Sequence, residues 1–415
     1  MKSIKRYFYL LMHLGNIIWA LFYEFKAVLS CLKIINSKSD IVIFDDIFPH
    51  NLSPFRIEEF TEYLYTFSDI KIYSTASAFP VVNEKRSFRK IAEAYFTIHP
   101  ETKNKVLKYR PHLYLSSKLA YIVFLSNMWA ILSNLERHKV PFIFTLYPGG
   151  GFLLNDSNCD NRLKIIFQSK YFRHVVVTQK VVYNYLVEKK LCPKEKITYI
   201  FGVVMPISIF ESAKKFDKHF FKKDKSSFDV CFVAHKYSHQ GKDKGYDIFI
   251  ETARLLHSYS NDFHFHIVGP WSIEDYNING LEKNIHFYGS QSTSFFSEFY
   301  SKMDIILSPN RPNILNYGSF DGFPTGAVTE ASLNGVAMFI TDPLDLNEVF
   351  INNEEIVLIN EKPIEIVEII IPYYKQPLLL YTLASKGSTK SWEIYGKEAQ
   401  MNPRISLLKK QLELE

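Results

Sequence analysis

Residues 304–335 read DIILSPNRPNILNYGSFDGFPTGAVTEASLNG, and the order of elements they predict indicates an α/β protein. It begins with a short apolar run at 304–309, whose length and polar flanks predict a buried strand. A helix-like run follows the segment FDGFPTGAVTEA at 320–331 and stops at Asn334 and Gly335, where a helix end is favoured. An acid, a glycine turn, a helix start and a second acid therefore follow a strand within one short segment.

This order of residues suits a site for a sugar joined to a nucleotide diphosphate. Gly322 and Gly326 let the backbone approach a ligand closely, and the amides of 325–327 at a helix start bind phosphate readily. Asp321 and Glu330 can accept hydrogen bonds from hydroxyl groups. Ordinary structural roles are also open: Asp321 as a turn residue, and Glu330 as a glutamate that favours the helix dipole by roughly 0.3–1 kcal/mol.

Strand-like and helix-like runs alternate outward from this stretch through the second half of the chain. Strands are predicted at 229–233, 263–268, 285–287, 304–307 and 337–340, and helices at 246–258 and 292–302. Strands that alternate with helices at this spacing form a parallel sheet with helices on its faces.

The first half repeats the alternation. Strands are predicted at 40–45, 70–73, 141–146, 174–178 and 196–200, and helices at 55–64, 119–135 and 181–188. The chain is therefore predicted to be α/β, with two Rossmann-like doubly wound domains facing across a cleft. We expect an apolar N-terminal extension at 1–36, an acceptor-side domain at 37–210, a linker at 211–227, a donor-binding domain at 228–375 and C-terminal helices at 376–415.

Composition narrows the class of protein. The 415 residues are enough for two domains, and the net charge of +6 is mild and spread out. This balance suits anionic substrates or an anionic membrane surface and argues against a nucleic-acid partner. The four cysteines are far apart, so we expect buried reduced thiols in a cytoplasmic protein.

The N-terminus carries a basic flank and then the mostly apolar run YFYLLMHLGNIIWALFY at 7–23. A spanning helix needs roughly 20 apolar residues, and this run is shorter and contains His13 and Asn16. We expect an apolar helix at the inner face of the membrane. A single membrane span and a helix packed on the protein's own surface stay open.

Five segments of the second half, in order, resemble a known family. They are GKDKGYD at 241–247, FHIVG at 265–269, IHFYG at 285–289, DIILSP at 304–309, and DGFP with the following EA and NGVA between 321 and 337. Together they resemble the retaining GT-B glycosyltransferases of glycosyltransferase family 4, the glycosyl transferases group 1 type. The first half resembles that family by pattern, from Asp45 to Arg56.

The resemblance implies a set of donor-binding residues. Lys244 would pair with the donor phosphates, with Lys236 in place of the family's arginine, and Glu330 would bind the ribose hydroxyls. Asp321 would be the catalytic acid near the transferred sugar. The remaining donor-side residues implied are Gly269, Gly322, Phe323, Thr325 and Gly326. The family usually has Glu at the first acid and seven residues between the acids, whereas this chain has Asp and one residue more.

A glycine-rich loop in the first half is the expected opposite wall of the cleft. It contains Tyr147, Gly149, Gly150 and Gly151, and the glycines let the backbone approach a donor or acceptor. A structural turn is the alternative. His50, in the first loop, is an acceptor-side candidate.

The expected function is a retaining glycosyltransferase that moves a sugar from a nucleotide-sugar donor to a saccharide or lipid-linked glycan, in bacterial cell-surface polysaccharide biosynthesis. No D-x-D pair occurs in the sequence, so we expect no required metal and no cofactor. Two alternatives stay open: a catalytically silent binding subunit of the same fold, and a nucleotide-sugar epimerase or phosphorylase.

Overall fold

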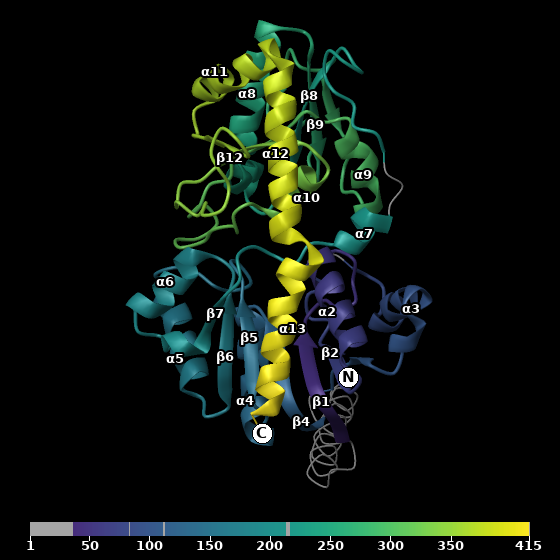
Figure 1. Ribbon diagram of the computed structural model, residues 1–415, viewed down its shortest axis with the longest axis vertical. Coiled ribbons are helices and arrows are strands. Elements are labelled where there is room, and N and C mark those ends of the chain that lie inside the picture. Colours follow the sequence, from purple (N-terminus) through teal and green to yellow (C-terminus); the bar gives the residue numbers. More distant parts are fainter. Residues whose placement is uncertain (1–35, 83, 111–112, 213–215, 415) are drawn as a thin grey trace, which may run out of the picture.

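The computed structural model describes residues 36–414, apart from 83, 111–112 and 213–215. The chain forms two α/β domains stacked along the long axis of the molecule, with the first domain at the bottom of Figure 1 and the second at the top. The expected N-terminal helix, at 1–36, lies almost wholly outside the described residues. No helix among the described residues is long and apolar enough to cross a membrane.

The first domain is built on a seven-stranded sheet in the order β3-β2-β1-β4-β5-β6-β7, with every pairing parallel. Its elements are β1 (Asn36–Asp45), α2 (Pro54–Thr66), β2 (Ile70–Ser74), α3 (Phe88–Ile98), η1 (Pro100–Thr102), β3 (Val106–Lys108), β4 (Tyr114–Val123), α4 (Leu125–His138), β5 (Phe142–Leu146), α5 (Ser157–Gln168), β6 (Phe172–Val177), α6 (Lys180–Glu188), η2 (Lys194–Lys196), β7 (Ile197–Tyr199) and α7 (Ile207–Ser212). Residues 41–44 of the central strand β1 are almost completely buried, as a strand covered by helices on both faces requires.

The second domain is built on a six-stranded parallel sheet in the order β10-β9-β8-β11-β12-β13. Its elements are β8 (Phe228–Val233), η3 (His239–Lys244), α8 (Tyr246–Tyr259), β9 (Phe263–Val268), β10 (Ile285–Phe287), α9 (Thr293–Ser301), β11 (Ile305–Ser308), α10 (Gly326–Leu333), β12 (Ala337–Thr341), β13 (Val357–Ile359), α11 (Pro363–Lys375) and α12 (Pro377–Tyr395). Two doubly wound halves are therefore confirmed.

The predicted helix at 119–135 is wrong in its first part. Residues 119–123 belong to strand β4, which pairs with β1 and β5 at the centre of the first sheet, and helix α4 begins at Leu125. Between them Phe124 has a positive φ of 71°, which separates strand from helix. A short run of buried apolar residues has the same composition in a central strand as in a buried helix, so periodicity could not distinguish them.

The last helix, α13 (Lys397–Glu413), returns to the first domain. It continues from α12 after Gly396, and in Figure 1 the two helices run down the front of the molecule from the second domain to the first. Met401 and Leu408 of α13 join the core cluster on one face of the first sheet. The C-terminal segment therefore ties the two domains together.

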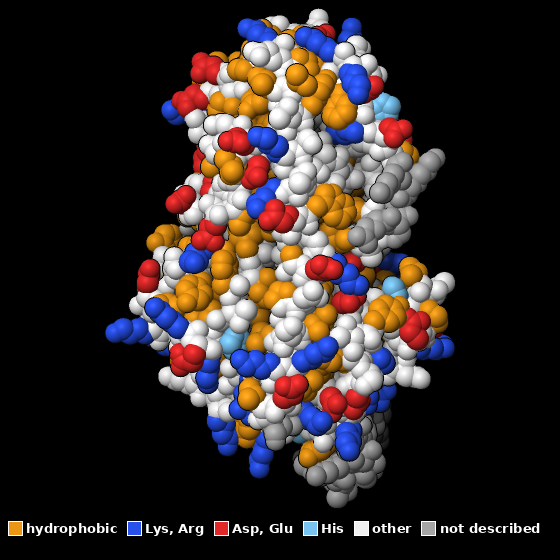
Figure 2. Space-filling model, viewed as in Figure 1, with side chains coloured by type: hydrophobic (Ala, Val, Ile, Leu, Met, Phe, Trp, Pro, Cys, Tyr) orange, Lys and Arg blue, Asp and Glu red, His pale blue; other side chains and the backbone are white. Residues whose placement is uncertain are grey.

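Both signs of charge are interspersed over the face seen in Figure 2, with hydrophobic side chains between the charged ones. Cys159, Cys192 and Cys231 are buried and free. Direct contacts also join the domains: the amide of Leu154 donates to the carbonyl of Gly318 over 2.9 Å, and the rings of Phe152 and Phe320 lie 6.3 Å apart.

Candidate functional site

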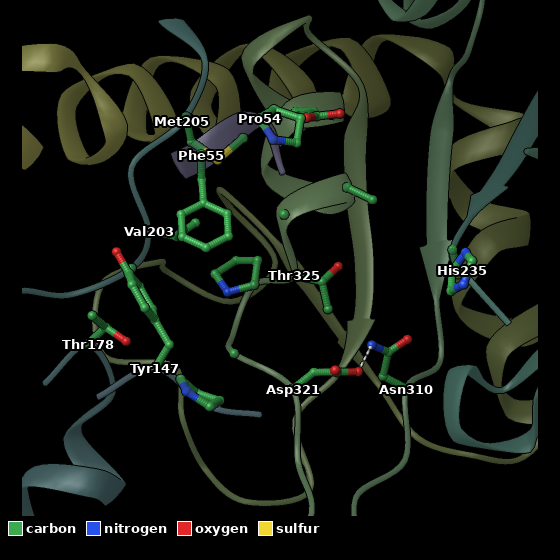
Figure 3. Close-up of a pocket in the computed structure, with 18 of the residues that line it drawn as sticks. Pro54, Phe55, Tyr147, Thr178, Val203, Met205, His235, Asn310, Asp321 and Thr325 are labelled. Atoms are coloured by element: carbon green, nitrogen blue, oxygen red, sulfur yellow. Dashed lines mark hydrogen bonds between the residues drawn. The ribbon is translucent and has the colours of Figure 1, made fainter. Parts of the chain in front are cut away.

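A cavity of about 460 Å³ lies between the two domains, within the size range of small-molecule sites. Residues that follow β5 and β6 line it on the first-domain side, and residues that follow β8 and β11 line it on the second-domain side. In Figure 3, Phe55, Tyr147 and Thr178 lie across the cavity from Asp321 and Asn310. The cavity therefore lies beyond the carboxyl ends of parallel strands, where open α/β sheets bind their ligands.

Lys244 and Asp321 meet in this cavity. Nζ of Lys244 donates to Oδ2 of Asp321 over 2.5 Å, and Nδ2 of Asn310 donates to the same oxygen over 2.8 Å. The Lys244 side chain is 9% exposed and the Asp321 side chain 40%, so the cation is the more deeply held partner. Lys244 Nζ also lies 5.2 Å from the ring centroid of Tyr237.

The backbone conformation of Gly245 allows Lys244 to lie close to the end of β11. It adopts φ of +69°, and a Cβ atom there would lie 2.0 Å from the carbonyl oxygen of Pro309. A residue with a side chain would force the start of α8 away from the segment that leads to Asn310 and Asp321. The left-handed backbone and the close contact both require glycine.

The start of helix α10 forms the next part of the wall. Gly322, Thr325 and Gly326 line the cavity, and Thr325 is the N-cap residue, with no hydrogen bond from its side chain to the helix. The first amides of a helix lack carbonyl partners within it, so this end of α10 offers donors to an anion. Phe323 is buried, and its carbonyl accepts from Nε2 of Gln179 over 3.3 Å.

Glu330 lies one turn into α10 and also lines the cavity. No described residue forms a hydrogen bond or ion pair with its carboxyl group, and burial raises its pKa from 4.5 to about 8. A carboxylate that faces a cavity without a protein partner can accept hydrogen bonds from ligand hydroxyls. The structure therefore brings Lys244, Asp321, Gly322, Thr325, Gly326 and Glu330 into one wall.

Some residues expected on the donor side lie outside the cavity lining. Nζ of Lys236 forms an ion pair with Oδ1 of Asp275 at 2.6 Å. Gly269 has φ of +134°, and a Cβ atom there would lie 2.0 Å from the carbonyl oxygen of Ala234, so it serves close packing at the ends of β8 and β9. The neighbour of Lys236, His235, does line the cavity, and burial with the Lys244 ammonium lowers its pKa.

The acceptor-side residues divide in the same way. Tyr147 lines the cavity, whereas Gly149, Gly150 and Gly151 do not, although all three have positive φ. A Cβ atom on Gly150 would lie 2.2 Å from the Phe124 side chain, so this glycine lets the loop pack against the start of α4. His50 is buried away from the cavity, with Nε2 2.7 Å from Oε2 of Glu84.

Several lining residues were missed by the sequence analysis. Asn310, Thr178 and Gln179 each follow the end of a strand, and that position was the available signal. Phe55, at the start of α2, also lines the cavity, with its ring 5.4 Å from that of Tyr147. The first-domain wall is thus mainly aromatic and apolar.

A buried polar network stands behind Tyr147. Nη2 of Arg404, in α13, lies 3.4 Å from the Tyr147 hydroxyl, and Tyr121 and Tyr63 both donate to Oε1 of Glu59. Arg404 is 2% exposed and Glu59 is fully buried. Burial raises the pKa values of Tyr147 and Glu59, which Arg404 opposes in both cases. The guanidinium group of Arg404, in the C-terminal helix, therefore supports the cavity wall at Tyr147.

Within the described part of the chain, no group of three or more His, Cys, Asp or Glu residues is arranged to hold a metal ion. Among the described residues that line the cavity, Lys244 is the only Lys or Arg, and the start of α10 adds backbone amides.

The fold is shared with solved structures. A structure of Anabaena Alr3699/HepE in complex with UDP superposes with a TM-score of 0.63 at 12% identity, over 89% of this chain and 100% of that one. A glycosyltransferase from Rickettsia africae gives 0.59 at 14% identity, over 91% and 99%. Sucrose-phosphate synthase from Thermosynechococcus elongatus gives 0.56 at 12% identity, over 90% and 99%.

Sequence comparison is more restricted. No curated protein matches the sequence. Residues 227–376 match the family described as Glycosyl transferases group 1, and this segment holds Lys244, Asp321 and Glu330. The chain therefore has the GT-B fold, with a second domain that matches the glycosyl transferases group 1.

Proposed function

We propose that this protein is a retaining glycosyltransferase that transfers a sugar from a nucleotide-diphosphate sugar to a hydroxyl group of a saccharide or lipid-linked glycan. The observation that carries the proposal is one wall of the cavity. There Lys244 and the start of α10 offer positive charge to a diphosphate, and the carboxyl group of Glu330, which has no partner among the described residues, lies one turn further along.

Each group has a role in binding the donor. The Lys244 ammonium pairs with the diphosphate as a point charge, and the free amides of α10 bind its oxygens. Glu330 accepts hydrogen bonds from the ribose hydroxyls. Solved relatives of the same fold contain UDP and UDP-glucose, which supports a nucleotide sugar as the donor here.

In the transfer, the bond between the anomeric carbon and the donor phosphate oxygen breaks, and a bond to the acceptor oxygen forms. Negative charge builds on the departing diphosphate, where Lys244 and the α10 amides stabilise it. The acceptor's proton passes to an oxygen of that diphosphate, and Asp321 stands beside the transferred sugar. Lys244 and the amides at the start of α10 supply the positive charge without a metal ion.

We further propose a place for the reaction. The basic and apolar N-terminus, at 1–36, suits association with the inner face of the membrane, and hence acceptors in cell-surface polysaccharide biosynthesis. Deletion of residues 1–30 should move the protein from the membrane fraction to the supernatant. Unchanged fractionation would contradict this assignment.

Binding of UDP by isothermal titration calorimetry tests the donor site. Lys244→Ala should weaken UDP binding about 10- to 100-fold, because a hydrogen bond to a charged group contributes about 1.5–3 kcal/mol. Lys242→Ala is the matched control, since Lys242 is exposed, lies two residues before Lys244 and is absent from the cavity lining. Equal UDP affinity in both variants would remove Lys244 from the donor site.

A further inference from the structure

Two neighbouring polar residues interrupt the apolar first-domain wall of the cavity. Thr178 directly follows β6, and Gln179 is the N-cap residue of α6. Thr178 is 1% exposed and Gln179 is 2% exposed, and both line the cavity. Figure 3 shows Thr178 beside Tyr147 in this wall.

Each residue keeps one polar atom without a partner. Among the described residues, Oγ1 of Thr178 and Oε1 of Gln179 have no hydrogen-bond partner. A buried polar atom left unpaired costs about 1–3 kcal/mol, so two in one cavity wall indicate a ligand that pairs with them.

The orientation of the Gln179 amide is fixed. Its Nε2 donates to the carbonyl oxygen of Phe323 over 3.3 Å, and the reversed amide would place two acceptors against each other. The atom left free is therefore the acceptor Oε1. Thr178 adds a hydroxyl group that can donate or accept, so the two residues together suit hydroxyl groups.

A phosphate does not suit this position. Phosphate oxygens are acceptors, and they would face the acceptor Oε1 of Gln179 without a hydrogen to share. The diphosphate instead has the cation and amides of the opposite wall, at Lys244 and α10. The first-domain pair thus belongs to another part of the ligand.

Gln179 also lies close to the segment that carries Asp321, the proposed catalytic acid. A Cβ atom built on Gly322 would lie 3.6 Å from Nε2 of Gln179 and 3.9 Å from Cγ of Pro148. Gln179 therefore packs beside the residue that follows Asp321. Phe55 and Tyr147 contribute aromatic rings to the same wall, and the negative face of an aromatic ring attracts positively polarised C–H groups, such as those of a sugar ring.

We propose that Thr178 and Gln179 recognise hydroxyl groups of a sugar ring that packs on the aromatic wall formed by Phe55 and Tyr147. This assignment rests on the proposed glycosyltransferase function and names the residues that select the sugar. The ring belongs either to the transferred sugar or to the acceptor, and both present the same chemistry to the pair.

The test compares Thr178→Val with Thr252→Val. Thr252, in α8, is also fully buried, and its hydroxyl has no hydrogen-bond partner in the described part of the chain, but it does not line the cavity. Three quantities are measured: UDP affinity, hydrolysis of the nucleotide sugar that the wild-type protein turns over fastest, and binding of a panel of methyl hexopyranosides to the protein–UDP complex. The panel includes singly deoxygenated sugars.

We expect Thr178→Val to keep the UDP affinity and to weaken one sugar-dependent quantity roughly tenfold. A fall in hydrolysis assigns the pair to the transferred sugar, and a fall in glycoside binding assigns it to the acceptor. The variant should also lose the wild-type preference for one hydroxyl over its deoxy analogue, which a structural role would not affect. A Gln179→Met variant should change the same quantity.

Three results would overturn the assignment. The first is a Thr178→Val variant whose sugar-dependent quantities and deoxy-sugar discrimination equal those of the wild type while UDP still binds, and in that case the proposed function stands. The second is an equal loss in Thr252→Val. The third is a wild-type protein that binds no nucleotide sugar, which removes both the proposed function and this assignment.

Discussion

Nζ of Lys244 lies 2.5 Å from Oδ2 of Asp321, so the cation expected to bind the diphosphate is paired with the acid expected beside the transferred sugar. Asn310 holds the same carboxylate oxygen at 2.8 Å. A diphosphate that binds Lys244 must compete with this carboxylate. We therefore expect donor binding to weaken the contact between Lys244 and Asp321.

Asp321→Asn should separate binding from catalysis. The amide removes the charge that competes for Lys244, so UDP affinity should rise up to about fivefold, because the Asp321 side chain is 40% exposed and water-screened ion pairs contribute about 0.2–1 kcal/mol. Sugar transfer should fall at least about a hundredfold if Asp321 acts on the transferred sugar. Calorimetry and nucleotide release measure the two effects, and an Asp321→Asn variant with weaker UDP binding would contradict the competition.

Donor affinity should depend on pH through Glu330. Its pKa is raised from 4.5 to about 8, so the free protein holds this carboxyl group largely neutral at pH 7. Ribose hydroxyls favour the ionised acceptor, so UDP-glucose affinity should rise between pH 6.5 and 8.5 by at most about tenfold per pH unit, as one proton is released. Isothermal titration in buffers of different ionisation enthalpy measures both the affinity and the proton.

Glu330→Gln is the control for that titration and should give a flat pH profile with weaker binding. The stability of the free protein should change with pH in the opposite direction. Because the pKa of Glu330 is higher in the folded than in the unfolded state, its protonation stabilises the fold. That contribution is present below pH 4.5 and is lost as the pH rises to about 8. A wild-type affinity for UDP-glucose that falls with pH would contradict the ribose assignment.

Gly245→Ala should weaken UDP binding more than Gly280→Ala does. Both glycines have positive φ, at 69° and 85°, so alanine strains the backbone in each by about 1–2 kcal/mol. At Gly245 the added Cβ atom would also lie 2.0 Å from the carbonyl oxygen of Pro309, whereas nothing lies within 4 Å at Gly280. Equal UDP affinities in the two variants would show that this contact does not position Lys244.

Arg404→Met should lower the free energy of unfolding by about 3–5 kcal/mol, the cost of removing one partner from a buried charged network. Lys409→Met, on an exposed site of the same helix, should have little effect. Denaturant unfolding of both variants, and of each combined with Glu59→Gln, measures the coupling across the network. If Arg404→Met were as stable as Lys409→Met, the network would not fasten α13 to the first domain.

The strands of both sheets could largely be predicted because they are short, apolar and bounded by turn residues. The short strands β3 and β13 were not predicted, and neither was β4. The buried run of β4 leads through Phe124 directly into the buried face of α4, and no turn residue marks the boundary. Its place between β1 and β5 depends on pairing with distant residues, which a local pattern does not contain.

The second-domain wall of the cavity could be predicted from the sequence. Four of its residues are close in sequence, namely Asp321, Gly322, Thr325 and Glu330. Lys244 opens a helix at the same edge of the sheet. In the first-domain wall Tyr147 was predicted and lines the cavity, whereas Thr178 and Gln179 were not predicted, because their role depends on the contact between the two domains. The hydrogen bond from Gln179 to the carbonyl of Phe323 joins residues of different domains. Contacts between residues so far apart in the chain produce no recognisable pattern in the sequence.

The most direct test is release of nucleotide from a panel of UDP-, GDP- and TDP-sugars by the purified protein, with and without glycan acceptors. We predict that at least one donor releases its nucleoside diphosphate faster than without protein, and that Lys244→Ala and Glu330→Gln reduce this rate while Lys242→Ala does not. If no donor in the panel either binds or releases its nucleotide, the protein is not a glycosyltransferase of these donors and the proposed function is wrong.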